Sequence, residues 1–193
     1  MGAKGPKNTR TWGGGGEPQR GKDFNFILDL DFMEAALGCE KQIRLSNGVS
    51  YKVKIPPGVK EGAKIRLTGK GEPGLYGGNA GDLFIEPHIL SHRYFRRNGE
   101  DIEIDLPITF SEALQGATVR VPTLDGSVQL KIPANAQSGQ KMRLKGKGIK
   151  KEDKTGDLYV ILQIRLPASL DEKTKIDLLK ILEGKEGDPR TGF

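Results

Sequence analysis

The sequence contains two copies of one module, and this internal repeat constrains the fold more than any other feature. The block FMEAALG (residues 32–38) returns as FSEALQG (residues 110–116), displaced by 78 residues. The block KIPPGVKEGAKIRLTGKG (54–71) returns as KIPANAQSGQKMRLKGKG (131–148), with ten of eighteen positions identical. GDLFIEPHI from Gly81 returns as GDLYVILQI from Gly156. Because the three blocks keep their order, we expect two domains of the same topology in tandem.

Each copy has the pattern of a small, mostly β module. Apolar residues alternate with polar ones over residues 24–28 and again over 102–106, as on a strand with one buried face. The next block suits one or two helical turns, and two short strands joined by a hairpin follow it. Both copies then share a glycine after the helical turns, a glycine in the hairpin turn and a proline that ends the returning strand. These are Gly38, Gly48 and Pro56 in the first copy, and Gly116, Gly126 and Pro133 in the second.

The fold class predicted from these patterns is mainly β. We expect two tandem, mainly β domains of similar topology, with short helices and a C-terminal helix. A flexible Gly-rich linker or tag remnant is expected over residues 1–22, a first domain over 23–98 and a second domain over 99–168. Residues 169–193 should then form the C-terminal helix and a tail.

The C-terminal segment has the pattern of a helix. Ser169 with Glu172 matches a capping box. Four apolar residues follow near helical spacing, namely Ile176, Leu178, Leu179 and Leu182. A helix this short is marginal alone in water, so its apolar side needs a partner. Docking onto its own chain and contact with a second copy are both open at this point.

Composition excludes several classes of protein. With 29% charged and 35% hydrophobic residues, the chain has the composition of a soluble globular protein, and we expect it in the cytoplasm. It has no apolar run of about 18 residues, so no membrane segment is expected. Cys39 is the only cysteine, which excludes an internal disulfide and a cysteine-built zinc site. The net charge of +6 would suit an acidic partner or nucleic acid, but the basic residues are spread along the chain.

The stretch GKGEPGLYGGNAGD, residues 69–82, is rich enough in glycine to suggest a phosphate-binding loop. Glu72, however, would place a negative charge in the anion site, Pro73 has no N–H to donate, and no helical pattern follows. We therefore expect turn glycines here. His88 and His92 belong to no catalytic or metal-binding motif. The sequence thus predicts a protein that is not an enzyme and that uses no metal or other cofactor.

Several stretches together resemble the C-terminal substrate-binding region of the DnaJ-type (J-domain) co-chaperones. They are the two FxEAxxG-like blocks, KIPPGVKEGAKIRLTGKGEPG, GGNAGDL, HRYFRRNGEDIEIDLPITFSEALQG and VPTLDG, and they cover about residues 23–184. A helical J-domain with its His-Pro-Asp sequence is not found in the 193 residues, nor is a cysteine-rich zinc module. The resemblance is therefore to the zinc-free subclass, without the J-domain.

This resemblance implies two tandem β-sandwich-like domains, a dimerisation segment within residues 169–193 and a function in protein folding. The first domain would capture exposed hydrophobic segments of unfolded polypeptides in a shallow groove, with the peptide pairing along a strand, and would so prevent aggregation. In an intact protein the segments would be delivered to a DnaK-type chaperone. Matching the FxEAxxG block assigns the groove to five residues: Phe26, Leu28, Ile43 and Leu45, with Phe95 nearby. Phe26, Ile43 and Leu45 are each larger or more apolar than their second-copy counterparts Ile104, Val121 and Thr123. A binding groove in the first copy would explain this difference, and the alternative is that these are core residues.

The resemblance implies further partners as well. It favours a homodimer made through the C-terminal helix, and it allows the acidic tail of a DnaK-type chaperone to bind near Lys52 or Lys54. The rival hypothesis is a basic, β-rich nucleic-acid-binding protein, whose basic set would add Lys64, Arg66 and Lys70. Proteins that bind single strands usually interleave exposed aromatics with the basic residues, and only Tyr51 lies near these in the sequence.

Overall fold

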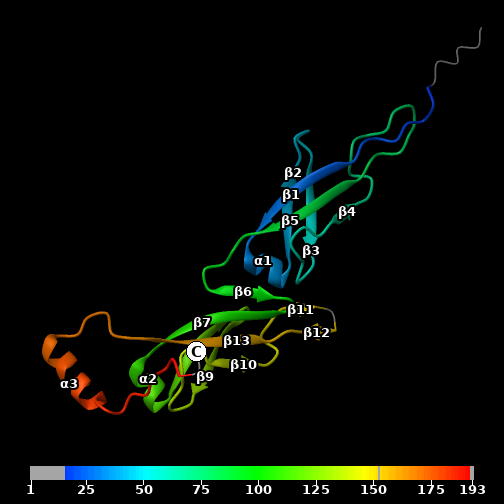
Figure 1. The fold of residues 1–193 in the computed structure, drawn as a ribbon. Coiled ribbons are helices and arrows are strands. Elements are labelled where there is room, and N and C mark those ends of the chain that lie inside the picture. Colours follow the sequence, from blue (N-terminus) through cyan, green and yellow to red (C-terminus); the bar gives the residue numbers. More distant parts are fainter. Residues whose placement is uncertain (1–15, 152, 192–193) are drawn as a thin grey trace, which may run out of the picture. The chain divides into compact units, whose positions relative to one another are not determined.

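The computed structural model describes residues 16–151 and 153–191, which form two compact units (Figure 1). The first unit consists of Met1–Arg93 with Ile149–Lys154, and the second of Tyr94–Gly148 with Thr155–Phe193. The larger part of the expected linker, residues 1–15, lies outside the described residues. The mainly β class and the short helices predicted from the sequence are confirmed.

The first unit packs two small sheets around one core. Its elements are, in chain order, β1 (Phe24–Leu30), α1 (Phe32–Leu37), β2 (Cys39–Arg44), β3 (Ser50–Ile55), β4 (Ile65–Leu67) and β5 (Leu83–Ile89). One sheet has the order β1-β5-β4, and the other pairs β2 with β3. β1 and β5 run parallel, with Phe24 opposite Leu83. The sequence did not predict this parallel pair, in which the first and last strands of the copy lie side by side.

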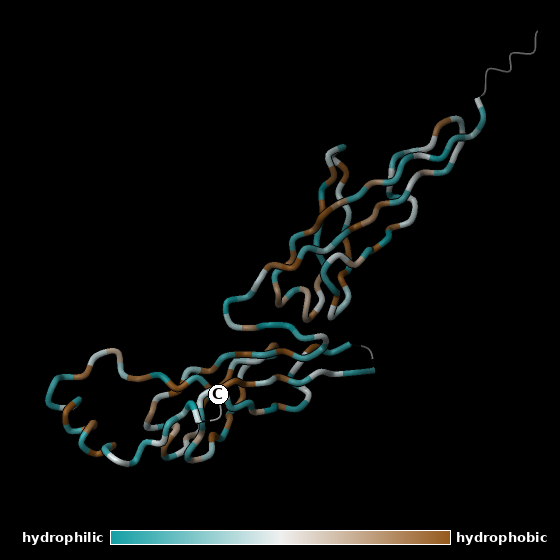
Figure 2. The backbone as a smooth tube through the Cα atoms, viewed as in Figure 1, coloured by the Kyte–Doolittle hydropathy of each residue, from teal (hydrophilic) through white to brown (hydrophobic). Residues whose placement is uncertain are grey.

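The alternating pattern of the strands explains this core. Every second residue of β1 turns inward, so Leu28 and Leu30 are buried while Ile27 is 70% exposed. β5 is the central strand of its sheet and contributes Leu83 and Ile85, both fully buried. Hydrophobic residues are accordingly interspersed with hydrophilic ones along these strands in Figure 2. Complete burial of one such side chain contributes about 1.5–3 kcal/mol to folding.

The second unit repeats this plan with additions. Its elements are β6 (Phe95–Asn98), β7 (Asp101–Thr109), α2 (Phe110–Gln115), β8 (Ala117–Thr123), β9 (Gly126–Ile132), β10 (Lys141–Leu144), β13 (Leu158–Arg165) and α3 (Glu172–Leu182). The larger sheet has the order β10-β13-β7-β6, β8 pairs with β9, and β7 runs parallel to β13. Two very short strands, β11 (Lys150–Lys151) and β12 (Lys154–Thr155), form a sheet of their own.

Two local features differ from the sequence-based expectation. β6 pairs antiparallel with β7, so residues 94–98 lie with the second unit and not with the first. The predicted capping box of Ser169 and Glu172 is wrong, because α3 begins two residues later than that box requires. Asp171 is the N-cap instead, and its carboxylate accepts a hydrogen bond from the backbone N–H of Thr174 at 2.9 Å.

The aspartate of the GDL sequence makes the same set of bonds in both copies. Asp82 is 2% exposed and accepts hydrogen bonds from the Gly69 N–H at 2.8 Å and from Arg66 Nε at 2.9 Å. Its own N–H donates to the Asp23 carboxylate at 2.7 Å, which joins the start of β5 to the start of β1. The second copy repeats each bond with the equivalent residues Asp157, Gly146, Arg143 and Asp101. The hydrogen bond from the Gly69 amide, together with Arg66, lowers the pKa of Asp82, and the Gly146 amide and Arg143 do the same for Asp157.

The glycine-rich loop between β4 and β5 receives the segment that precedes β1. Gln19 and Leu75 exchange two backbone hydrogen bonds of 3.0 and 2.9 Å, and the Gly21 N–H donates to the Asn79 carbonyl. In Figure 1 the two segments run side by side away from the sheets. A Cβ on Gly78 would lie 2.0 Å from the Gln19 carbonyl oxygen, so glycine is required there by close backbone approach and not by a turn. Residues 19–22, part of the expected linker, are therefore bonded to the first unit.

Of the helices in the described residues, none has the length and the apolar character that crossing a bilayer requires.

We predict that replacing Asp82 and Asp157 by asparagine lowers the melting temperature by several degrees at pH 7 and flattens its acid dependence. Because folding lowers both pKa values, the stabilisation is complete above the ordinary carboxyl pKa of 3.8 and is lost as the pH falls through the lowered values. Thermal unfolding followed by circular dichroism between about pH 7 and pH 2.5 measures this. Asp29→Asn, on the exposed face of β1, is the matched control and should keep the wild-type curve.

We predict that Gly78→Ala separates residues 16–22 from the glycine-rich loop, because the added methyl group collides with the Gln19 backbone. Hydrogen exchange should then accelerate at the amides of Gln19 and Gly21 by about tenfold or more, while the amides of β5 keep their protection. Gly187→Ala adds the same methyl group in open space and should change nothing. Wild-type protection at Gln19 in Gly78→Ala would contradict the steric argument.

Candidate functional site

The outer edge of β2 has no neighbouring strand among the residues that the structure describes. β2 pairs only with β3, and its side chains alternate, so that Ile43 enters the core while Gln42 and Arg44 are exposed. An unpaired edge presents backbone N–H and C=O groups to any extended polypeptide that lies beside it. The edge of β2 is therefore a place where this unit could take up a further strand.

The four predicted groove residues of the first unit lie together in and around its core. Leu28, Ile43 and Leu45 are core members with exposed fractions of 8%, 3% and 7%. Phe26 is half-buried and packs against the same cluster. Three of the four are thus covered in this structure, as the core alternative expects, and Phe26 is the member that offers surface. Their role in a groove stays a prediction.

Phe95, the fifth predicted residue, belongs to the second unit. It lies on β6 opposite Ile104 of β7 and is 6% exposed. Its partner Ile104 is the counterpart of Phe26 when the two copies are matched by their 78-residue displacement. The structure therefore does not place Phe95 in the same unit as the other four residues.

Other apolar side chains pack against the first core while staying partly exposed. Together with Phe26 they make up what we call the apolar rim: Phe24, Phe26, Tyr51, Ile65 and Leu67. The sequence reasoning did not select Phe24 or Tyr51 as site residues. The period-two pattern that singled out Phe26 includes Phe24, and Tyr51 lies directly opposite Ile43 in the β2–β3 pairing, so the signal for both was present.

Ion pairs occupy several of the basic residues around β2 and β3. Lys52 Nζ lies 2.5 Å from a Glu40 carboxylate oxygen, and Lys41 Nζ lies 2.7 Å from Glu34. The hydrogen bond between Lys52 and Glu40 raises the pKa of the lysine and lowers that of the glutamate. Lys54 is exposed on β3. Of the two lysines predicted to meet an acidic tail, Lys52 therefore already has an acidic partner within the chain.

Two further residues that suggested nucleic-acid binding, Arg66 and Lys70, also have partners within the chain. Arg66 is bound to Asp82, and Lys70 lies over the Tyr51 ring with its Nζ 5.5 Å from the ring centroid. Tyr51 is the aromatic residue on which a base would have stacked. Because a lysine covers one face of this ring, the arrangement does not form an open stacking platform.

Helix α3 exposes the four residues predicted for dimerisation to different degrees. Ile176 is 50% exposed, Leu178 is 37% exposed and Leu179 is 68% exposed, while Leu182 is half-buried. Leu178 and Leu182 line a cavity of about 550 Å³ with Phe110, Leu166 and Leu170. The apolar side of α3 is therefore only partly covered within its own unit.

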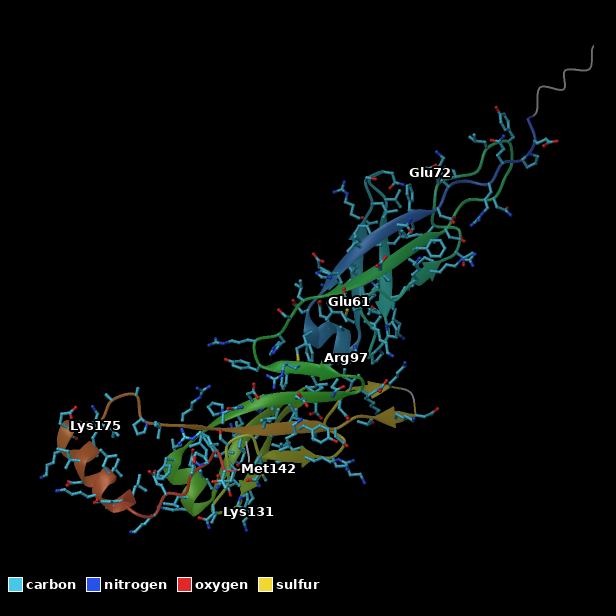
Figure 3. All side chains as sticks on the ribbon, in the orientation of Figure 1. Glu61, Glu72, Arg97, Lys131, Met142 and Lys175 are labelled. Atoms are coloured by element: carbon cyan, nitrogen blue, oxygen red, sulfur yellow. The ribbon has the colours of Figure 1, made fainter. Side chains whose placement is uncertain are left out.

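No group of three or more His, Cys, Asp or Glu side chains in the described residues is placed to hold a metal ion. Cys39 is half-buried, and its partial burial raises the pKa of the thiol. Glu61, labelled in Figure 3, binds His88 Nδ1 at 2.9 Å and the Ile89 N–H at 2.6 Å, and so ties the loop before β4 to β5. The bond to Glu61 raises the pKa of His88. These contacts stabilise the loop and form no catalytic arrangement.

Comparison with known proteins finds a family match that spans both copies of the repeat. The family model described as DnaJ C terminal domain matches residues 24–167. Curated relatives named "Chaperone protein DnaJ" include that of Burkholderia pseudomallei strain 1710b, which is 44% identical over 145 residues, covering 73% of this chain and 38% of the relative. The protein of Parageobacillus thermoglucosidasius is 43% identical over 144 residues, covering 74% and 38%. That of Bacillus cereus strain 03BB102 is 41% identical over 155 residues, covering 79% and 42%.

The matched region begins at the first residue of β1, includes both copies of the repeat and ends just after β13. The chain spans about two fifths of the length of the curated relatives that it matches. The family match covers well over half of the chain itself. The chain therefore belongs to the family defined by the DnaJ C terminal domain.

Proposed function

We propose that this chain is the polypeptide-binding part of a co-chaperone. It captures exposed hydrophobic segments of unfolded chains, keeps them from aggregating and, within a longer protein, delivers them to a DnaK-type chaperone. The observation that carries this proposal is the unpaired edge of β2, in a unit whose core has an apolar and partly exposed rim. The three curated relatives described above, each named "Chaperone protein DnaJ", support the same function.

The proposed binding mode follows from the two parts of this surface. Backbone groups along β2 pair with an extended segment whatever its sequence, while the apolar rim favours segments with large hydrophobic side chains. Each side chain that becomes buried contributes about 1.5–3 kcal/mol before the cost of ordering the segment is subtracted. Weak, exchangeable binding in the micromolar range is the expected result. Such binding suits a protein that must release its clients.

The groove proposal includes the core residues Leu28, Ile43 and Leu45. Because they are buried, they act as the floor beneath the rim, and the rim is the part that a client contacts first. An aspartate at Ile43 would be buried without a partner and would unfold the unit, so it cannot test binding. The useful variants are therefore those at the rim.

Two partners complete the proposal. The acidic tail of a DnaK-type chaperone binds near Lys54 and Lys52, where the Glu40 partner of Lys52 must be displaced. A second copy of the chain packs against the exposed leucines of α3 and the cavity beside them. Two linked copies would hold a client more firmly than one through effective concentration. The proposed setting is the cytoplasm, where the clients and the DnaK-type chaperone would both be met.

We predict that Phe26→Ala weakens the capture of unfolded protein. Light scattering of a chemically denatured reporter enzyme measures this, and about tenfold more of the variant should be needed for half-suppression of aggregation. Suppression by the wild type should persist from about 0.05 to 0.5 M salt, whereas nucleic-acid-type binding through phosphates would weaken steeply over that range.

The matched control is Ile27→Ala, which removes an apolar side chain from the neighbouring position on the opposite face of β1. It should suppress aggregation as the wild type does. Circular dichroism checks that both variants are folded. Equal suppression by Phe26→Ala and the wild type would mean that clients bind elsewhere.

We predict that the chain is a dimer and that Leu179→Glu converts it into a monomer. Leu179 is 68% exposed in the single chain and would be buried in the proposed interface, where a charge without a partner is strongly unfavourable. Light scattering coupled to size-exclusion chromatography should show twice the mass of one chain for the wild type and a single mass for the variant. Lys173→Glu, in the first turn of α3, is the control and should stay dimeric. A monomeric wild type would overturn this part of the proposal.

A further inference from the structure

The two copies of the repeat differ at the edges where a client strand would pair, and this inference rests on the function proposed above. β8 is the counterpart of β2, since both follow a short helix and both form the first strand of a two-stranded sheet. The 78-residue displacement matches Arg44 of β2 with Pro122 of β8. The two edges differ at this position only if the backbones of both residues face outward, away from the paired strand.

The backbone of Arg44 faces the outer edge of β2. The Leu45 N–H donates to the Val49 carbonyl at 2.9 Å, so the backbone groups of Leu45 face the returning strand. In an antiparallel pair, successive residues alternate between facing the partner strand and facing away from it. Arg44, opposite Ser50, therefore turns its N–H outward, as do Gln42 and Glu40 in the same phase. The edge of β2 presents an uninterrupted row of donors.

The backbone of Pro122 lies at the same place on β8. The pairing of β8 with β9 reaches Thr123 opposite Gly126 across a two-residue turn, and such a closing pair exchanges its backbone hydrogen bonds. Pro122, opposite Ser127, is in the alternate phase and faces outward. Proline has no N–H, so the donor that Arg44 provides in the first copy is missing in the second.

The second copy also lacks the other open edge of the first copy, that of β1. β7 corresponds to β1, and its outer side is covered by β6, which places Phe95 opposite Ile104. β1 pairs only with β5 among the described residues. Both edges that could meet a client are thus open in the first copy, whereas in the second copy one lacks a donor and the other is occupied by the chain itself.

We propose that Pro122 is a specificity-determining residue that closes the edge of β8 to added strands, so that of the two counterpart edges an extended client segment pairs with β2 and not with β8. The outward N–H of Arg44 is then the donor that distinguishes the two copies. The side chain of Arg44 is not required, because the pairing uses its backbone.

The repeat itself supplies the test. Arg44→Pro transfers the proline of the second copy to the first, and the position tolerates proline because its N–H makes no bond to β3. Arg44→Ala removes the same side chain and keeps the N–H. Binding is measured by fluorescence anisotropy with a fluorescein-labelled, C-terminally amidated heptapeptide that has three central leucines. Arg44→Pro should weaken binding by about tenfold, the effect of one lost hydrogen bond with an unpaired carbonyl, and Arg44→Ala by less than about twofold.

Hydrogen exchange on the wild type gives a second readout that needs no variant. Adding the same peptide should slow exchange at the amides of Gln42 and Arg44. It should leave the exchange rate unchanged at Arg120, the counterpart of Gln42 on β8. Equal binding by Arg44→Pro and Arg44→Ala, or equal protection of Gln42 and Arg120, would overturn the inference while leaving capture by the apolar rim intact. Failure of the wild type to bind the peptide or to suppress aggregation would instead overturn the proposed function, and with it this inference.

Discussion

A buried aspartate joins the first and last strands of each copy, and the rest of each unit is built on that junction. Asp82 binds the glycine turn after β4 and Arg66 through its carboxylate, and its backbone N–H binds Asp23. The Phe24 N–H returns a bond to the Asp82 carbonyl at 2.8 Å. These bonds fix the register of the parallel pair β1–β5 at its first residues. Because a shift by one residue would turn every inward side chain outward, the junction decides which residues form the core.

The duplication shows which parts of the module are free to change. The aspartate junction, the short helix with its closing glycine and the two-stranded hairpin are the same in both copies. The edges and loops are different, since the second copy gains β6 and a proline in β8, while the first copy gains the glycine-rich loop that binds residues 19–21. Differences of this kind leave the core intact and change only what each surface can bind. Two copies of one fold can therefore divide their tasks.

Local sequence signals predicted the elements of this fold well. Alternation located β1 and β7, the closing glycines located the ends of α1 and α2, and Pro56 and Pro133 follow directly after β3 and β9. The parallel pairing of β1 with β5 was not predictable, because it joins residues about 60 positions apart and leaves no local pattern. The N-cap of α3 was misplaced because Asp171 and Ser169 are both good caps, and only the structure distinguishes them. For the site, the sequence selected Phe26 but could not show that Leu28, Ile43 and Leu45 lie beneath the surface.

The bonding of residues 19–21 to the glycine-rich loop has a mechanical consequence. Tension that reaches the first unit from its N-terminal side first meets the Gln19–Leu75 bridge and the contact of Arg20 with Asp82. The Gln19–Leu75 bonds join irregular segments that lie away from the sheets in Figure 1, and they would break before β1 carries the force. The parallel strands and the core behind them are thereby shielded from pulling. A partner tethered at this end could move without changing the shape of the surface that we propose for clients.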